Sequence, residues 1–111
     1  MAWVAGAGCA SMPGGASAGK VVVVGGGYGG ATAAKYIRMW SGGRVDVTLV
    51  EPNESFVSCP LSNLVLGGSR QLADLTVPYA SLTRAHGVAV VRDTVASIDA
   101  KLKIAVLTSG A

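Results

Sequence analysis

Residues 20–51, KVVVVGGGYGGATAAKYIRMWSGGRVDVTLVE, decide the fold of this 111-residue chain. The stretch begins with Val21–Val24, four β-branched residues in a row, which is the pattern of a parallel strand buried on both faces. A glycine-rich turn follows, then a helical pattern over residues 31–40 that Ser41-Gly42-Gly43 stops, and then a second strand over residues 45–50. The helical face would hold Gly30, Ala33, Ala34, Ile37 and Trp40. This order predicts one right-handed βαβ unit of a parallel sheet.

The glycine-rich turn satisfies G-x-G-x-x-G at Gly25, Gly27 and Gly30. The first glycine permits a tight turn, the second lets a pyrophosphate approach the backbone, and the third lets helix and strand pack closely. The phosphates then lie at the helix N-terminus, where free N–H groups and the helix dipole favour anions. The motif therefore predicts a dinucleotide site, and its spacing leaves FAD and NAD open.

Glu51 strengthens this prediction, because it ends the second strand 21 residues after Gly30. An acidic side chain at that place can accept hydrogen bonds from a ribose diol, and Glu rather than Arg argues against a ribose 2′-phosphate. The alternative is a purely structural turn, with Glu51 as an exposed charge at the end of a strand.

The composition excludes several classes of protein. Half of the residues are hydrophobic and 14% are charged, so a single small folded domain is expected rather than a disordered chain. The net charge of +3 comes from scattered basic residues, which indicates a solvated basic surface and no nucleic-acid partner. Two cysteines, Cys9 and Cys59, and the single His86 predict neither a metal site nor a Ser/His/Asp triad. His86 itself is expected at a surface helix end.

Residues 1–19 carry no charge and consist mainly of small residues. We expect them to be a leader, the end of an export signal, because Ala16-Ser17-Ala18 has the small-x-small form of a signal-peptidase site. The stretch is too short and too rich in glycine for a transmembrane segment. This interpretation predicts a periplasmic protein whose residues 20–111 are the N-terminal part of an FAD/NAD(P)-binding domain. The alternative is a flexible extension of a cytoplasmic protein.

Residues 52–63, PNESFVSCPLSN, form a turn-rich segment that contains a thiol, where a simple NAD-binding unit would continue into another crossover helix. From Lys20 to the end, the chain resembles the flavoprotein subunits of flavocytochrome c sulfide dehydrogenases and the related sulfide:quinone oxidoreductases. These are FAD-dependent enzymes of the pyridine nucleotide-disulfide oxidoreductase type. The segments GGATAAKY and EPN…C-x-L-S-N-x-V-x-G-G carry the resemblance.

The resemblance implies that the cofactor is FAD, with the glycines at its pyrophosphate and Glu51 at its adenosine ribose. Cys59 would be a redox cysteine near the isoalloxazine, and the backbone around Thr94 and Val95 would lie near the adenine. The implied FAD-binding residues are Gly25, Gly27, Tyr28, Gly29, Gly30, Glu51, Pro52, Leu61, Ser62, Thr94 and Val95. The side chains of Tyr28 and Trp40 are interpreted as packing residues rather than as stacking platforms.

The resemblance also implies a reaction. In such enzymes the first redox cysteine pairs with a second one far downstream, sulfide attacks the disulfide, and electrons pass through FAD to a c-type cytochrome subunit. Apart from Cys59 this sequence has only Cys9, in the expected leader, so we interpret the chain as an N-terminal fragment that does not oxidise sulfide alone. Two alternatives remain: a related flavoenzyme that uses quinone or NAD(P)H, and a non-catalytic dinucleotide-binding module.

The rest of the chain is consistent with an α/β fold. Residues 75–85 have helical character interrupted at Pro78, and residues 88–92 are expected to form a third parallel strand. Residues 94–99 and 103–108 alternate apolar and polar side chains around a turn at 99–101, as an antiparallel pair would. The predicted fold is therefore a Rossmann-like, FAD-binding βαβ unit with a parallel sheet and the start of a small antiparallel meander, forming an incomplete domain.

Overall fold

A three-stranded parallel sheet lies at the centre of the computed structural model, which describes residues 16–110. Its strands are β1 (Gly19–Val24), β2 (Val45–Val50) and β5 (Ala89–Val91), in the order β1-β2-β5. Val21 pairs with Val47 across β1 and β2, and Thr48 pairs with Ala89 across β2 and β5. The predicted βαβ unit and the third parallel strand are confirmed.

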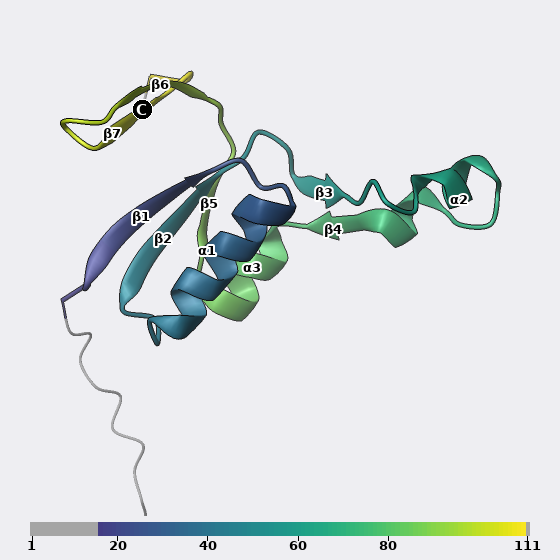
Figure 1. The fold of residues 1–111 in the computed structure, drawn as a ribbon, viewed down its shortest axis with the longest axis horizontal. Helices are drawn as coiled ribbons and strands as arrows, with labels where there is room; N and C mark the ends of the chain where they lie inside the picture. Colours follow the sequence, from purple (N-terminus) through teal and green to yellow (C-terminus); the bar gives the residue numbers. More distant parts are fainter. Residues whose placement is uncertain (1–15, 111) are drawn as a thin grey trace, which may run out of the picture.

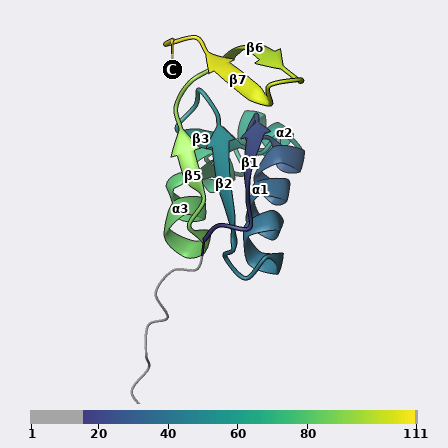
Figure 2. The same ribbon diagram turned by 90° about the vertical axis from the view of Figure 1, so that its left-hand side faces the viewer.

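Two helices, α1 (Tyr28–Trp40) and α3 (Ala80–His86), cover one face of this sheet (Figure 2). The buried core between them and the sheet includes Ala34, Leu49 and Val88. On β1 the burial alternates, and Val22 and Val24 are each 52% exposed. The prediction that β1 is buried on both faces is therefore wrong for the described residues, because both helices pack on the same side.

Helix α1 begins at Tyr28, inside the glycine motif, and not at Ala31 as predicted. It ends at Trp40, and the following turn stops it as expected. The predicted apolar face is displaced, since Trp40 is 80% exposed and its ring lies on Tyr36, with ring centroids 4.9 Å apart. The residues that pack toward the core are Ala31, Ala34 and Ile37.

Residues 55–78 form an arm that extends away from the sheet (Figure 1). Its elements are β3 (Ser55–Val57), α2 (Ser62–Leu66), the 3₁₀ helix η1 (Leu72–Leu75) and β4 (Thr76–Pro78). Strands β3 and β4 are antiparallel, with Phe56 opposite Val77. The prediction of helical character is wrong over residues 76–79, because residues 76–78 pair with β3 and place Pro78 at the end of an edge strand, while Leu75 ends the 3₁₀ helix η1.

The predicted antiparallel pair is present as β6 (Val95–Asp99) and β7 (Ile104–Leu107). The turn between these strands comprises residues 100–103, so it is later than the predicted turn at 99–101. The pair lies beyond the carboxyl ends of the sheet strands (Figures 1 and 2).

The expected leader falls mostly outside the described residues, since residues 1–15, Cys9 among them, are not described. Its last residues join the sheet, because Ala18 N–H donates to Arg44 O at 2.7 Å and β1 begins at Gly19. Among residues 16–110 there is no helix with the length and apolar character needed to cross a membrane.

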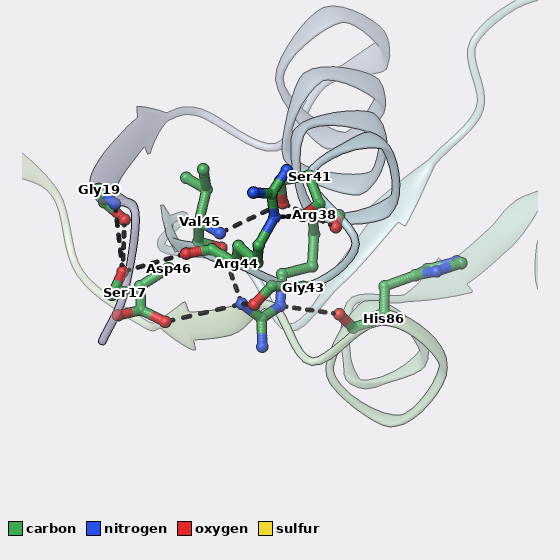
Figure 3. A network of polar contacts seen from close by, with 9 residues as sticks. All are labelled: Ser17, Gly19, Arg38, Ser41, Gly43, Arg44, Val45, Asp46 and His86. Carbon is green, nitrogen blue, oxygen red and sulfur yellow. Dashed lines mark hydrogen bonds and ion pairs between the residues drawn. The ribbon is translucent and has the colours of Figure 1, made fainter. Parts of the chain in front are cut away.

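Arg38 joins several segments at the end of the sheet where β2 begins, which is the end opposite to β6 and β7 (Figure 3). Its Nη1 donates to Gly43 O at 2.5 Å and to Val45 O at 2.7 Å, and its Nε donates to His86 O at 3.3 Å. Nη1 also lies 3.6 Å from Asp46 Oδ1. One guanidinium therefore ties α1 to the turn after it, to β2 and to the last residue of α3, which is His86 as predicted.

Candidate dinucleotide site

The glycine turn between β1 and α1 is held close to both elements. Gly25 has φ +86°, in the left-handed region that glycine tolerates, and its N–H donates to Val50 O at 2.9 Å. A Cβ on Gly30 would overlap the carbonyl oxygen of Gly25, so α1 packs directly on the turn. A Cβ on Gly27 would meet nothing within 4 Å. The backbone at Gly27 is therefore open to a ligand.

The first turn of α1 presents free backbone donors next to this open backbone. Gly27 is the N-cap residue, no side chain caps the helix, and no acidic residue lies in the first turn. An uncapped N-terminus leaves up to four N–H groups without an intrahelical partner and carries the positive end of the helix dipole. The turn and helix therefore fit a pyrophosphate group, the anion that such sites bind.

Glu51 lies at the end of β2 and is buried, with 7% of its surface exposed. Its Oε2 accepts from Gly26 N at 2.7 Å, and its Oε1 accepts from Asn53 N at 3.0 Å and Asn53 Nδ2 at 2.7 Å. The alternative interpretation of Glu51 as an exposed charge is thus wrong. Because a carboxylate has about four lone-pair positions, one acceptor position remains for a ligand hydroxyl.

These hydrogen bonds also set the charge of Glu51. Burial raises the pKa of the carboxyl, but the hydrogen bonds from Gly26 N–H, Asn53 N–H and the Asn53 side chain outweigh burial and leave the pKa below its usual value. Glu51 is therefore an anion at neutral pH, the state in which it accepts hydrogen bonds from a diol.

Tyr79 is part of this site although the sequence analysis missed it. Its side chain is 5% exposed, and its Oη donates to Gly26 O at 2.7 Å. A Cβ on Gly26 would lie only 2.5 Å from the ring of Tyr79. Gly26, a glycine at an x position of the motif, was the available signal, since it indicates that something packs closely there.

Tyr28, at the start of α1, connects the glycine turn to the arm. Its ring meets the Phe56 ring edge-on, with centroids 4.8 Å apart and planes at 74°. Its hydroxyl lies 2.5 Å from Ser58 Oγ. The Tyr28 side chain thus packs against Phe56, although 56% of it is exposed. Beside this contact lies a largely apolar cavity of about 330 Å³, between the first turn of α1, the arm and α3.

The predicted redox residue Cys59 follows Ser58 in the arm, and its thiol is free and exposed. Its carbonyl oxygen accepts from Ser62 N at 2.9 Å. Leu61 and Ser62, at the start of α2, are also exposed, as is Pro52 in the turn after β2. The structure thus places the Cys59 segment next to the glycine turn through the contact between Tyr28 and Ser58.

Thr94 and Val95 precede and begin β6, at the same end of the sheet as the glycine turn (Figure 2). The backbone of Thr94 is engaged locally, because its carbonyl accepts from Thr108 N at 2.8 Å and its N–H donates to Asp93 Oδ1 at 2.7 Å. None of the hydrogen bonds among residues 16–110 joins Thr94 or Val95 to the turn or to Glu51.

In the same part of the chain, no three His, Cys, Asp or Glu side chains could hold a metal ion together.

A dinucleotide-binding βαβ unit is the class of protein that this fold and site define. The sequence profile of the pyridine nucleotide-disulphide oxidoreductase family matches residues 19–110, and the chain belongs to this family.

Comparisons with individual proteins agree. The chain is 59% identical over 46 residues to the flavoprotein chain of the sulfide dehydrogenase (flavocytochrome c) of Chlorobaculum thiosulfatiphilum, covering 41% of this chain and 94% of the relative. Its fold matches the sulfide:quinone oxidoreductase of Aquifex aeolicus with a TM-score of 0.72 and 29% identity over 85% of this chain. The match spans 22% of that larger chain. The resemblance stated from the sequence is confirmed.

Proposed function

We propose that this chain is the FAD-binding portion of a flavin-dependent oxidoreductase that oxidises sulfide through Cys59 and passes electrons to a c-type cytochrome. The observation that carries the proposal is the uncapped N-terminus of α1 beside the anionic Glu51. It is supported by 59% identity to a flavocytochrome c flavoprotein chain. The name of that relative also motivates a cytochrome partner, and the small-x-small form of Ala16-Ser17-Ala18 motivates a periplasmic location.

The residues of the site fit FAD. The N–H groups from Gly27 to Gly30 would hold the pyrophosphate, and the remaining acceptor position of Glu51 would hold the adenosine ribose. Pro52, Thr94 and Val95 would contact the adenosine from the same end of the sheet. When bound, FAD supplies two-electron redox chemistry and passes the electrons on to the acceptor.

Cys59 would provide the sulfur chemistry. In the complete enzyme, Cys59 would form a disulfide with a second cysteine, with Leu61 and Ser62 beside it. Hydrosulfide would attack one sulfur, the S–S bond would break, and a persulfide would form on one cysteine while the other leaves as a thiolate. The exposed thiol of Cys59 is accessible for such a reaction.

A second candidate is a related oxidoreductase that transfers electrons to quinone or NAD(P)⁺. The similarity of the fold to a sulfide:quinone oxidoreductase, with a TM-score of 0.72, supports this second candidate. Both candidates use the same FAD site and the same cysteine, and they differ in the electron acceptor.

Two measurements test the proposal. Titration calorimetry of the chain with FAD and ADP should show binding of both, because both carry the adenosine and pyrophosphate groups that Glu51 and the glycine turn would hold. In the FAD-loaded protein that contains this chain, sulfide should bleach the flavin absorbance. Cys59→Ser should abolish the bleaching and leave FAD bound, whereas the control Ser69→Ala, at an exposed position of the same arm, should bleach normally. Normal bleaching by Cys59→Ser would contradict the redox role of Cys59.

The electron acceptor is identified in a third measurement. Reoxidation of the sulfide-reduced protein by a c-type cytochrome, and not by a soluble quinone or NAD⁺, is the expected result. Faster reoxidation by the quinone would favour the second candidate.

A further inference from the structure

The peptide groups on both sides of Gly26 are each fixed by a side chain from elsewhere in the fold. Gly26 N–H donates to Glu51 Oε2 at 2.7 Å, and Gly26 O accepts from Tyr79 Oη at 2.7 Å. Both contacts are buried. Glu51 comes from the end of β2, while Tyr79 comes from the residue before α3, so two separate elements hold one residue of the glycine turn.

The contact with Tyr79 determines where the next N–H group points. The carbonyl of Gly26 and the N–H of Gly27 belong to one planar trans peptide, in which the two groups point in opposite directions. Because Tyr79 holds the carbonyl on one side, the N–H of Gly27 must point to the other. No hydrogen bond from Gly27 N occurs within the part of the chain that the structure describes, and a Cβ there would meet nothing within 4 Å.

We propose that Tyr79 is a positioning residue of the dinucleotide site: its hydroxyl orients the Gly26–Gly27 peptide so that Gly27 N–H meets the pyrophosphate. The inference rests on the proposed function and adds to it a residue outside the glycine motif. A preoriented donor strengthens anion binding because the turn does not have to be ordered when the ligand arrives.

Three features of Tyr79 suit it to this role. Its backbone is anchored, since its N–H donates to Glu54 O at 3.2 Å. Its ring occupies the space that a side chain on residue 26 would need. Its hydroxyl is a neutral donor, because burial, with a smaller effect from the charge of Glu51, raises the pKa of the phenol above its usual value.

The test compares ligands with and without a pyrophosphate. Tyr79→Phe keeps the ring and removes the hydroxyl. The matched control is Tyr36→Phe, which changes a tyrosine toward the C-terminal end of α1, away from the glycine turn. We expect Tyr79→Phe to bind ADP and FAD about fivefold more weakly, the effect of one hydrogen bond, while its affinity for adenosine is unchanged. Tyr36→Phe should bind all three ligands as the wild type does.

A readout without ligand accompanies the titrations. In Tyr79→Phe, amide hydrogen exchange should become faster at Gly26, whose N–H is protected by its buried hydrogen bond to Glu51, and remain unchanged in the central strands. Equal losses for ADP and adenosine would show a general structural effect and overturn the proposal, as would wild-type affinity of the variant for ADP. A wild-type chain that binds neither FAD nor ADP would instead contradict the proposed function, and the exchange at Gly26 would then decide whether Tyr79 orders the turn.

Discussion

The two ends of the parallel sheet use polar side chains in opposite ways. At the end where β2 begins, Arg38 donates to the carbonyls of Gly43, Val45 and His86, and the donors and acceptors satisfy one another (Figure 3). At the end where β2 finishes, Glu51 and Tyr79 fix the Gly26 backbone, while the first turn of α1 has no cap. The first network stabilises the fold, and the second holds unpaired donors ready for an anion.

This difference predicts that substitutions at the two ends separate stability from binding. Removing Arg38 should affect the free energy of unfolding and leave the affinity of the folded protein unchanged. Changes at the glycine turn, Glu51 or Tyr79 should affect the affinity for adenine nucleotides. The four predictions below use this separation.

The largest effect is expected for Gly30→Ala. The added Cβ would overlap the carbonyl oxygen of Gly25, a backbone atom, so α1 must move away from the turn. We expect a loss of about 3 kcal/mol of stability in urea unfolding, together with loss of ADP binding. Gly29→Ala is the control for stability, because a Cβ there meets nothing within 4 Å. Equal stability of the two variants would mean that α1 does not pack on the turn as described.

Arg38→Met should come next. The substitution leaves three carbonyl oxygens without their donor and should lower the free energy of unfolding by about 2 kcal/mol, with unchanged ADP affinity under conditions where the variant is folded. Arg44→Met is the control, since Arg44 makes one exposed hydrogen bond to Ser41 O. A weaker affinity in Arg38→Met would show that the two ends are coupled.

Glu51→Gln should have a mixed effect. The glutamine side chain replaces one carboxylate oxygen with an NH₂ group, which is a donor and would face the N–H donors that Glu51 accepts from. We expect a destabilisation of about 1 kcal/mol. We also expect about tenfold weaker binding of adenosine, measured by calorimetry. Glu54→Gln is the control, because its carboxylate is exposed and lies 3.8 Å from the exposed Arg92. Unchanged adenosine binding by Glu51→Gln would remove Glu51 from the proposed ribose site.

The smallest effect is expected from pH. The folded-state pKa of Glu51 lies below its unfolded value of about 4.3, so the contribution of this carboxylate to stability is complete above that value and is lost as the pH falls through the folded pKa. The Tm of the wild type, measured by thermal unfolding, should therefore fall more on acidification than the Tm of Glu51→Gln. Parallel pH profiles for the two proteins would show that Glu51 has an ordinary pKa.

The sequence predicted β1, α1 and β2 well because their patterns are local and strong. The four valines, the glycine turn and Glu51 lie within 31 residues that pair with one another. The arm was not predicted, since its strands have three residues each and β4 contains Pro78. Tyr79 was missed for a related reason, because its contact with Gly26 depends on how distant segments pack. A valine run also does not reveal whether one or both faces of a strand are covered.

The hydrogen bond between Tyr79 and Gly26 has a consequence for how the chain folds. It joins residues that are 53 positions apart, whereas β1, α1 and β2 are neighbours in sequence. Local contacts form early, and closing a long loop is slow because it costs more chain entropy. We therefore expect the βαβ unit to form first and the turn to reach its final shape when the segment before α3 docks. Binding competence would then follow the formation of the βαβ unit and would depend on this docking.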